Sequence, residues 1–361
     1  MRIAFYAPLK SPDHDVPSGD RQMARLLIRA LTMAGHEVGV ASQLRSYMGD
    51  GAAERWAAIK DEAEREIKRL SGEWPHGTMP DLWFCYHPYY KAPDLLGPVL
   101  ALRHGLMQVT AEASYSFRRN QGIWRETQVL VALSVDGADT NICITRRDRD
   151  GLAAAFPQAK LSNLAPFIDT QVYAGIHAAD NDQRLVVVAM MRKGDKLDSY
   201  TMLAAALREI ADLPWTLSVI GDGPMHGDVR ALFAHLAPRR IEWLGALAPE
   251  DVPGAFRGGG IYAWPGCGEA YGLAYMEAQA AGLPVVAQMT AGVPEVVSHG
   301  VAGLLTAPGD VQAYAAALRH LLVHSADRQR MAAAARRRAF ELHSLPAAAQ
   351  SLKHLLQGLT K

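Results

Sequence analysis

Short apolar runs alternate along the chain with longer segments whose apolar residues recur at helical spacing. The run at residues 2–7 precedes an amphipathic segment at 22–34, and the run at 37–41 precedes a charged helical segment at 52–71. Runs of the first kind are typical of buried strands, and the 3.6-residue recurrence is typical of helices. Further strands are predicted at 81–86, 106–111, 140–144, 185–189, 216–220 and 283–287. The alternation predicts an α/β fold with parallel sheets built from β-α-β units.

This alternation is interrupted at residues 163–169, which include Pro166. The length of 361 residues suits two domains of ordinary size. We therefore expect a first domain at 1–168 and a second at 169–345. Helices are predicted near 311–323 and 326–342, followed beyond Pro346 by a last helix at 347–358 within the segment 346–361.

Charge and composition exclude several classes of protein. Lys+Arg and Asp+Glu balance at 37 each, so we expect no nucleic-acid partner. The run 336–338, three arginines, is interpreted as a solvated helix face. Three cysteines without C-x-x-C spacing argue against a disulfide framework or zinc site and favour a reducing cytoplasm. No apolar run reaches the length of about eighteen residues that a membrane-spanning helix needs, and residues 1–8 are interpreted as a strand, not a signal peptide.

The most informative stretch is residues 265–277, where Glu269 and Glu277 lie on either side of a predicted helix start at Tyr271-Gly272-Leu273. A helix N-terminus offers N–H groups and a positive dipole end to an anion such as a diphosphate, and Gly272 allows close approach of the backbone. An ionised carboxylate accepts two hydroxyl donors at once. Glu269 precedes the helix and Glu277 is expected about two turns inside it, so both carboxylates can reach one site. The alternative is an exposed amphipathic helix with two solvated glutamates.

This stretch, with the strand at 283–287 and Gly-Val-Pro-Glu at 292–295, resembles the donor-sugar signature of glycosyltransferase family 4. The resemblance implies a GT-B fold: two Rossmann-like domains with parallel sheets that face each other across a cleft. It implies an acceptor-binding N-terminal domain, with the last helix packed back on it, and a C-terminal domain that binds a nucleotide sugar. It assigns catalysis at the donor sugar to Glu269 and the ribose diol to Glu277.

The resemblance also assigns basic residues and glycines to the donor diphosphate and nucleotide. Arg192 and Lys196 follow the strand at 185–189, and together they can offset two phosphate charges. Their spacing is shorter than the commonest family pattern, which leaves Lys193 as an alternative member of the pair. Gly221 and Gly223 form a turn after the strand at 216–220. A solvated basic turn is the alternative for the basic residues. The Gly-x-Gly turn also indicates a dinucleotide-binding fold with Glu242 as a ribose ligand, which we discount because such a turn should follow the first strand of its domain.

Candidate residues in the first domain are fewer. Gly19 lies before the first helix, where the family has a Gly-rich loop that faces the diphosphate and acceptor. The family often has two adjacent glycines there and this chain has one, so an ordinary loop residue before a helix is the alternative. Glu112 occupies the place where many family members have a histidine. A carboxylate there can accept a hydrogen bond from a donor-sugar hydroxyl or position the acceptor, but it cannot donate as a neutral imidazole does. His87 and Arg118 are candidates on the acceptor side, with a structural histidine and a solvated loop as the alternatives.

The resemblance implies a retaining transfer from a UDP- or GDP-linked sugar to a hydroxyl acceptor. Asp-x-Asp triplets begin at Asp13, Asp148 and Asp180, but none follows an apolar strand, so we expect no metal and no cofactor. A sugar-nucleotide 2-epimerase and a non-catalytic nucleotide-sugar-binding protein are the alternatives. We expect a cytoplasmic monomer or homodimer, with peripheral contact at the inner face of the membrane left open.

Overall fold

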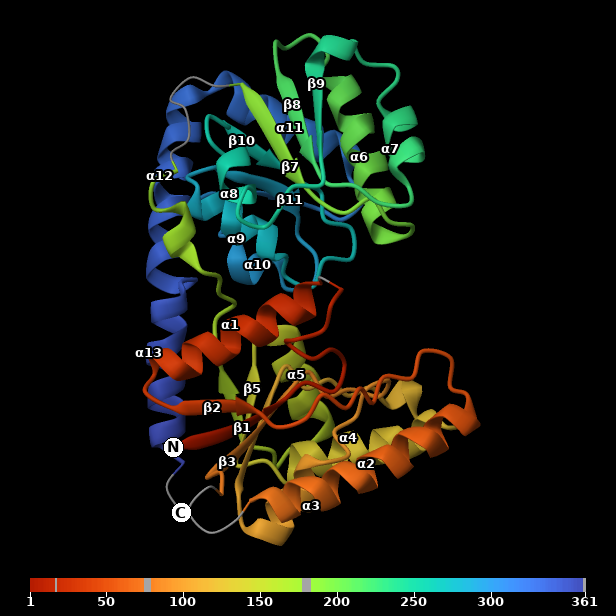
Figure 1. The fold of residues 1–361 in the computed structure, drawn as a ribbon. Coiled ribbons are helices and arrows are strands. Elements are labelled where there is room, and N and C mark those ends of the chain that lie inside the picture. The colour runs from red at the N-terminus through yellow and green to blue at the C-terminus, as the bar shows by residue number, and fades with distance from the viewer. Residues whose placement is uncertain (17, 75–78, 177–182, 360–361) are drawn as a thin grey trace. The chain divides into compact units, whose positions relative to one another are not determined.

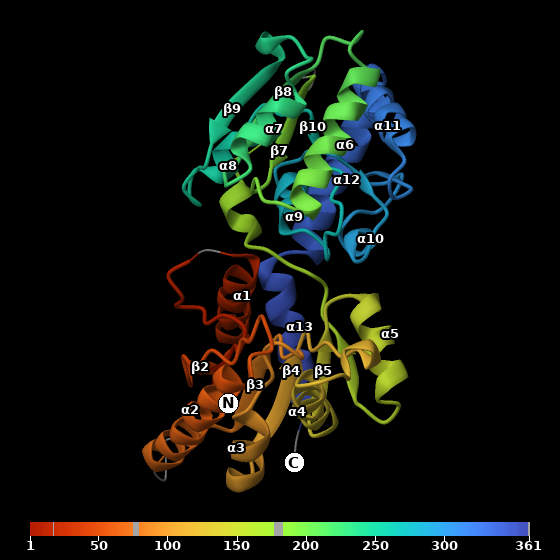
Figure 2. The same cartoon turned by 90° about the vertical axis from the view of Figure 1, so that its right-hand side faces the viewer.

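A computed structural model describes residues 1–16, 18–74, 79–176 and 183–359 and divides the chain into two compact units. Unit 1 comprises Met1–Ala165 and Leu345–Lys361, and unit 2 comprises Pro166–Ser344. Each unit contains a six-stranded sheet with helices on both of its faces (Figures 1 and 2). The predicted α/β class with two parallel sheets is confirmed.

The sheet of unit 1 has the order β2-β1-β3-β4-β5-β6, and all neighbouring strands are parallel. Its strands are β1 (Arg2–Tyr6), β2 (Glu37–Val40), β3 (Leu82–Tyr86), β4 (Met107–Ala111), β5 (Thr140–Cys143) and β6 (Leu161–Asn163). Its helices are α1 (Gly19–Met33), α2 (Ala53–Glu73), α3 (Gly97–His104), η1 (Phe117–Arg119, a 3₁₀ turn), α4 (Trp124–Asp136), α5 (Arg146–Ala155) and α13 (Leu345–Gln357). The chain runs outward in opposite directions from β1 and β3, so the topological switch point lies between these two strands.

The inner strands of unit 1 are apolar along their length because helices cover both faces of the sheet. Every residue of β3 and β5 is buried, whereas the edge strand β2 alternates between half-buried and exposed positions. Helices α1 and α13 pack together on one face, opposite α2, α3 and α4 (Figure 1). Helix α1 buries Met23, Leu27 and Leu31, and α13 buries Leu352 and Leu356.

A buried carboxylate fixes the connection between β3 and α3. Asp94 is fully buried and accepts hydrogen bonds from Trp83 Nε1 at 2.8 Å and from the backbone N–H groups of Leu96 and Gly97 at 2.9 and 2.8 Å. Burial raises the pKa of Asp94 although these hydrogen bonds oppose the shift. A carboxyl in this position joins the sheet to the start of the helix through three donors.

The sheet of unit 2 has the order β12-β11-β10-β7-β8-β9 and is also parallel. Its strands are β7 (Arg184–Val188), β8 (Thr216–Ile220), β9 (Ile241–Gly245), β10 (Ile261–Ala263), β11 (Val285–Gln288) and β12 (Gly303–Thr306). Its helices are η2 (Thr170–Tyr173), α6 (Asp195–Glu209), α7 (His226–Leu232), η3 (Pro238–Arg240), α8 (Val252–Ala255), α9 (Leu273–Ala280), α10 (Val293–Val296), α11 (Val311–Val323) and α12 (Ser325–Leu342). Here the switch point lies between β7 and β10.

The start of the last helix differs from the prediction. Helix α13 begins at Leu345, so Pro346 lies inside its first turn and does not separate it from the preceding segment. Proline suits this position because its missing N–H would have no partner within the helix.

The interpretation of the arginine run as a solvated face is wrong for Arg336. This half-buried side chain donates from Nη1 to the carbonyls of Ile176 and Ala280 at 2.7 and 2.6 Å. It also donates to the carbonyls of Ala174 at 2.6 Å and Tyr173 at 3.4 Å. The guanidinium thus binds backbone oxygens of two other segments of unit 2, the stretch 173–176 and the end of α9. Helical spacing alone does not reveal this role.

Candidate functional site

The carboxyl ends of β7 and β10 lie side by side at the switch point of unit 2, which is where ligands bind in open α/β sheets. The loop after β7 carries Arg192 and Lys193 and leads into α6, whose second residue is Lys196. The loop after β10 carries Glu269. Two of the predicted segments, far apart in the sequence, are therefore brought to the same edge of one sheet.

Lys196 and Glu269 form an ion pair at this edge. Lys196 Nζ donates to Glu269 Oε1, and Trp264 Nε1 donates to the same oxygen at 3.3 Å. The ammonium also lies 5.5 Å from the centre of the Trp264 ring. The side chains of Lys196 and Glu269 are 32% and 18% exposed, so the pair is open on one side to a ligand and packed on the other.

Glycines shape the loop that presents Glu269. Gly266 and Gly268 have φ values of 71° and 70°, in the left-handed region that favours glycine. A Cβ atom on Gly266 would lie 1.9 Å from the hydroxyl of Tyr275, and one on Gly268 would lie 2.3 Å from Oδ2 of Asp195. The loop is thus folded tightly against α6 and α9, which fixes where Glu269 stands.

Helix α9 begins at Leu273, directly after Gly272 with φ 76°. Gly272 is the N-cap and supplies no side-chain hydrogen bond to the helix start. Tyr271 is buried and Glu277 is half-buried. Glu277 is the fifth residue of α9, about one turn from its start, so the expected depth of two turns is wrong. The helix begins at Leu273, inside the predicted start at 271–273, and the four residues from there to Glu277 span about one turn.

Both glutamates of the motif lie near one buried tyrosine. Burial raises the pKa of Tyr262 well above its usual range, and the negative charges of Glu269 and Glu277 raise it further. The same three side chains therefore share one electrostatic environment at the end of β10. Arg192 and Lys193 are exposed in the loop after β7, and of the three basic candidates Lys196 is the one that contacts Glu269.

Gly221 and Gly223 pack against the backbone of the loop after β7. A Cβ atom on Gly221 would lie 1.9 Å from the carbonyl oxygen of Ala189, and one on Gly223 would lie 2.4 Å from that of Met191. The N–H of Met191 donates to the carbonyl of Asp222 at 3.0 Å. These glycines let two strand-end loops lie in contact, which positions the segment that carries Arg192 and Lys196.

A second polar group lies at the switch point of unit 1. His87 follows β3 and Glu112 follows β4, and these neighbouring strands pair Tyr86 with Ala111. The backbone N–H of His87 donates to the carbonyl of Ala111 at 2.8 Å. The two predicted side chains are thus adjacent residues on parallel strands, at the carboxyl edge of the sheet.

Asp20, in the first turn of α1, completes this group and was not predicted. Its Oδ1 lies 3.1 Å from Nδ1 of His87. Burial alone would lower the pKa of His87, but the Asp20 hydrogen bond and the charges of Glu112, Asp20 and Asp148 outweigh it and raise the pKa. Burial alone would raise the pKa of Asp20, but the hydrogen bond and charge of His87 outweigh it and lower that pKa. The one sequence signal for this contact with His87 is the position of Asp20 directly after Gly19.

Gly19 and Arg118 have less defined surroundings. Gly19 is the first residue of α1, after the N-cap Ser18, which accepts from the N–H of Arg21 at 3.2 Å. A Cβ atom on Gly19 would have no described atom within 4 Å, so the fold itself does not require glycine there. Arg118 is exposed on η1. Their assignments to the diphosphate and the acceptor stay predictions.

Comparison with known proteins identifies the family. The GDP-mannose-dependent alpha-(1-6)-phosphatidylinositol monomannoside mannosyltransferase of Mycolicibacterium smegmatis is 31% identical over 294 residues, which cover 74% of this chain and 72% of the relative. The chain belongs to the group 1 glycosyltransferases. A family model described as "Glycosyl transferases group 1" also matches residues 182–324, all of which belong to unit 2; residue 182 itself lies outside the described residues. The resemblance to glycosyltransferase family 4 is thereby confirmed, as is the assignment of the chain as an enzyme of this class.

Solved structures share the fold of this glycosyltransferase over nearly its whole length. A glycosyltransferase from Rickettsia africae has a TM-score of 0.75 at 13% identity and covers 99% of this chain and 98% of its own. The Anabaena protein Alr3699/HepE, in complex with UDP, has a TM-score of 0.73 at 17% identity and covers 99% and 100%. These likenesses show the GT-B fold.

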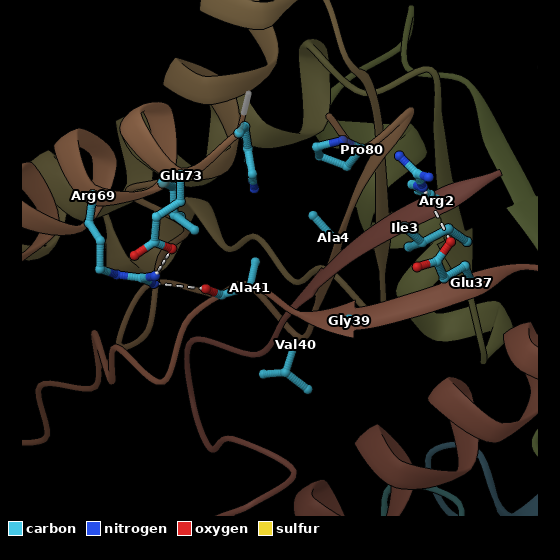
Figure 3. Close-up of a pocket in the computed structure, with 12 residues that line it drawn as sticks. Arg2, Ile3, Ala4, Glu37, Gly39, Val40, Ala41, Arg69, Glu73 and Pro80 are labelled. Carbon is cyan, nitrogen blue, oxygen red and sulfur yellow. Dashed lines mark hydrogen bonds and ion pairs between the residues drawn. The ribbon is translucent and has the colours of Figure 1, made fainter. Parts of the chain in front are cut away.

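A cavity of about 290 Å³ lies in unit 1 of the glycosyltransferase, between the start of β1, strand β2 and the end of α2 (Figure 3). Its charged side chains are paired: Arg2 contacts Glu37 at 3.2 Å, while Arg69 contacts Glu73 at 2.5 Å and the carbonyl of Ala41 at 3.0 Å (Figure 3). The described residues that line it include none of the predicted site residues. We therefore assign no substrate to this cavity.

Among the residues that the structure describes, no group of three or more His, Cys, Asp or Glu side chains is arranged to hold a metal ion. Of the three Asp-x-Asp triplets, the one at Asp13 lies in an exposed turn, and Asp148 lies in the first turn of α5, where Thr145 Oγ1 donates to it at 2.6 Å. The triplet at Asp180 lies outside the described residues. No helix in the described part of the chain has the length and apolar character needed to cross a membrane.

Proposed function

We propose that this glycosyltransferase transfers a sugar, with retention of anomeric configuration, from a nucleotide-diphosphate sugar to a hydroxyl acceptor in the synthesis of a glycan, glycolipid or other glycoconjugate. The observation that carries the proposal is the meeting of Lys196 and Glu269 at the switch point of unit 2. The donor is UDP- or GDP-linked. The name of the M. smegmatis relative specifies GDP-mannose, and the HepE structure holds UDP.

The donor diphosphate is proposed to bind between the start of α9 and the loop after β7. The uncapped N-terminus of α9 offers N–H groups and a positive dipole end. Arg192 and Lys196 supply cationic donors. Glu277, one turn into α9, is proposed to bind the ribose diol, and Gly221 and Gly223 to line the nucleotide.

The Lys196–Glu269 pair has a specific part in this scheme. Without substrate, each charge offsets the other, so the ammonium and the carboxylate are held in place. When a diphosphate binds, Lys196 can contact the phosphate oxygens while Glu269 turns toward the donor sugar. There the carboxylate stabilises the positive charge that develops at the anomeric carbon.

The transfer is proposed as a same-face substitution. The bond from the anomeric carbon to the leaving phosphate oxygen breaks, and a bond from the same carbon to the acceptor oxygen forms. The acceptor proton passes to the leaving phosphate oxygen. Lys196 and the N–H groups of α9 stabilise the departing diphosphate, and in this scheme no metal ion is needed for that task.

Unit 1 is proposed to bind the acceptor, with His87, Glu112 and Arg118 on that side. The acceptor is a hydroxyl compound whose identity is left to experiment. We propose that the reaction takes place in the cytoplasm, with peripheral contact to the inner face of the membrane when the acceptor is lipid-linked. The enzyme is proposed to act as a monomer or homodimer.

The test is a screen of the purified chain against UDP-, GDP-, ADP- and TDP-linked sugars, with and without EDTA, by thermal shift and donor hydrolysis. We expect one nucleotide family to raise the melting temperature, with slow hydrolysis that EDTA does not abolish. Loss of all hydrolysis in EDTA would refute metal independence. Production of an epimeric nucleotide sugar without an acceptor would establish the epimerase alternative, and binding without turnover would establish a sensor.

Matched variants test the division of roles within unit 2. Glu269→Gln is expected to lower kcat by about 10²-fold with a small change in donor affinity, because it removes charge stabilisation that is strongest in the transition state. Glu277→Ala is expected mainly to weaken donor binding. Glu250→Gln, at an exposed position of the same unit, is the control and should change neither constant. Equal effects of Glu269→Gln and Glu277→Ala on both constants would contradict the assignment.

A further inference from the structure

Two neighbouring residues at the carboxyl edge of unit 1 have strained backbones. Among the described residues, His87, Glu112 and Ala291 are the non-glycine residues with positive φ, and the values at His87 and Glu112 are 59° and 57°. The N–H of Glu112 still donates to the carbonyl of Ile142 at 2.8 Å, so the ladder of the sheet continues through the strained position. Such strain persists where the surrounding structure enforces it and clusters at functional sites.

Glu112 has an enclosed oxygen without a partner. Its Oε2 atom is closed off from solvent and receives no hydrogen bond from any described residue. An ionised carboxylate with an enclosed, unpaired oxygen is costly, whereas a protonated carboxyl can hold its proton on that oxygen and present an O–H donor. Buried polar atoms without partners in a native fold call for an explanation, and an absent ligand is one.

The charges around Glu112 point in the same direction. It faces the imidazole of His87 at the end of β3, the carboxylates of Asp20 on α1 and Asp148 on α5, and the hydroxyl of Tyr86. Burial is the main cause that raises the pKa of Glu112 to about 7, and the two aspartates add to it, while His87 and Tyr86 oppose it. Asp20 in turn holds His87 through Nδ1 at 3.1 Å.

We propose that Glu112 acts on the sugar substrate as a protonated carboxylic acid, whose Oε2 hydroxyl donates a hydrogen bond to a substrate oxygen, and that His87, held by Asp20, is its positioning partner. This proposal deepens the proposed transferase function and rests on it for the identity of the ligand. It also revises the sequence-based expectation for Glu112, which allowed this side chain only to accept. A carboxyl that keeps its proton provides the donor that a neutral imidazole would otherwise supply.

The substitution Glu112→Gln distinguishes a protonated carboxyl that donates from an ionised carboxylate that accepts. The glutamine amide is a permanent donor of nearly the same shape as the protonated carboxyl. If the protonated acid is the active form, wild-type kcat/KM falls about 25-fold between about pH 6.5 and pH 8.5 as Glu112 ionises. Glu112→Gln then stays active and changes less than about twofold over that interval. Glu112→Leu, which has no donor, is inactive at both values. His87→Asn removes a cationic neighbour and moves the alkaline limb of the wild-type profile to higher pH.

An active wild type whose kcat/KM rises with pH, together with an inactive Glu112→Gln, would overturn the proposal and make Glu112 an ionised acceptor. Glu64→Gln, at an exposed position of α2, is the matched control and should reproduce the wild-type profile. Thermal denaturation and nucleotide-sugar binding show whether each variant is folded.

A second measurement does not depend on turnover. Infrared difference spectra of the free protein between about pH 6 and pH 8 should show the C=O stretch of a protonated carboxyl that titrates near neutrality. The band should be absent from Glu112→Gln and present in Glu64→Gln. A spectrum of Glu112→Gln identical to that of the wild type would refute the proposal even if no nucleotide sugar were turned over, and the band with no turnover would refute the transferase proposal alone.

Discussion

Gly221 provides a sharp test of how unit 2 positions its basic residues. In Gly221→Ala the new Cβ atom would lie 1.9 Å from the carbonyl oxygen of Ala189, far inside the 3.0 Å that real Cβ contacts respect. Backbone faces it on this side, so the clash cannot be relieved by rotating a side chain. The φ of 138° adds strain because L side chains rarely adopt it.

The magnitude follows from these two contributions. A residue held in a sparsely populated backbone region costs about 1–3 kcal/mol, and overpacking costs about 1–3 kcal/mol more. We therefore expect Gly221→Ala to destabilise unit 2 by about 3–5 kcal/mol. For a domain of about this size, each kcal/mol lowers the melting temperature by about 2–4 °C, so the expected fall is on the order of 10 °C.

Differential scanning calorimetry measures the effect, with Gly227→Ala as the matched control. Gly227 lies in α7, where a Cβ atom meets no described atom within 4 Å, so alanine there should be neutral or stabilising by up to about 1 kcal/mol. Nucleotide-sugar affinity should fall in Gly221→Ala because the loop with Ala189 must move. A decrease of less than about 2 °C in the melting temperature of Gly221→Ala would refute the reasoning.

Three other substitutions test the structure independently. The pKa of Glu112 is about 7 in the folded chain and ordinarily 4.5, so between these pH values the folded state holds a proton that the unfolded state has lost. The free energy of unfolding therefore decreases by up to about 3 kcal/mol as the pH rises through that interval. Glu112→Gln should be more stable than the wild type at about pH 8 and not at about pH 4, and an equal difference in urea unfolding at both pH values would contradict this. Asp94→Ala removes the acceptor of Trp83 Nε1 and of two backbone donors and should cost about 2–4 kcal/mol in urea unfolding, whereas a loss below about 1 kcal/mol would show that water replaces it. Arg336→Met keeps much of the apolar stem but loses the donors to four carbonyls, so unit 2 should lose about 2–4 kcal/mol by calorimetry; a change within about 0.5 kcal/mol would show that these contacts are not needed.

Most of the strands could be predicted because an inner strand is buried on both faces and its sequence is therefore an apolar run. The inner strand β10 was missed because its three residues are too few to form such a run. The motif at 265–277 could be recognised because its glycines are required by the backbone of the motif itself. Gly266 and Gly268 allow a tight turn, and Gly272 precedes the helix. The helix start at Leu273 lies where it was predicted, but the depth of Glu277 was overestimated, because four residues span about one turn and not two.

Contacts between distant segments could not be predicted in the same way. Asp20 and His87 are brought together by the pairing of β1 with β3, and nothing in either segment alone indicates a partner. The solvated-face interpretation fails for Arg336 because its backbone acceptors lie in other segments, which the run of arginines does not indicate. Lys196 was preferred to Lys193 on the family pattern, but the sequence could not show that its ammonium lies beside Glu269.

The packing of α13 on α1 has a consequence for synthesis on the ribosome. Unit 1 contains both the first strand of the chain and the last helix, with all of unit 2 between them. The face of α1 that α13 covers therefore stays unprotected until more than three hundred further residues have been translated. Unit 2 is contiguous and can fold as soon as it emerges. The part of unit 1 that precedes unit 2 is thus completed only after unit 2 has been translated, so nascent chains that stall between unit 2 and α13 would expose this surface to chaperones and proteases.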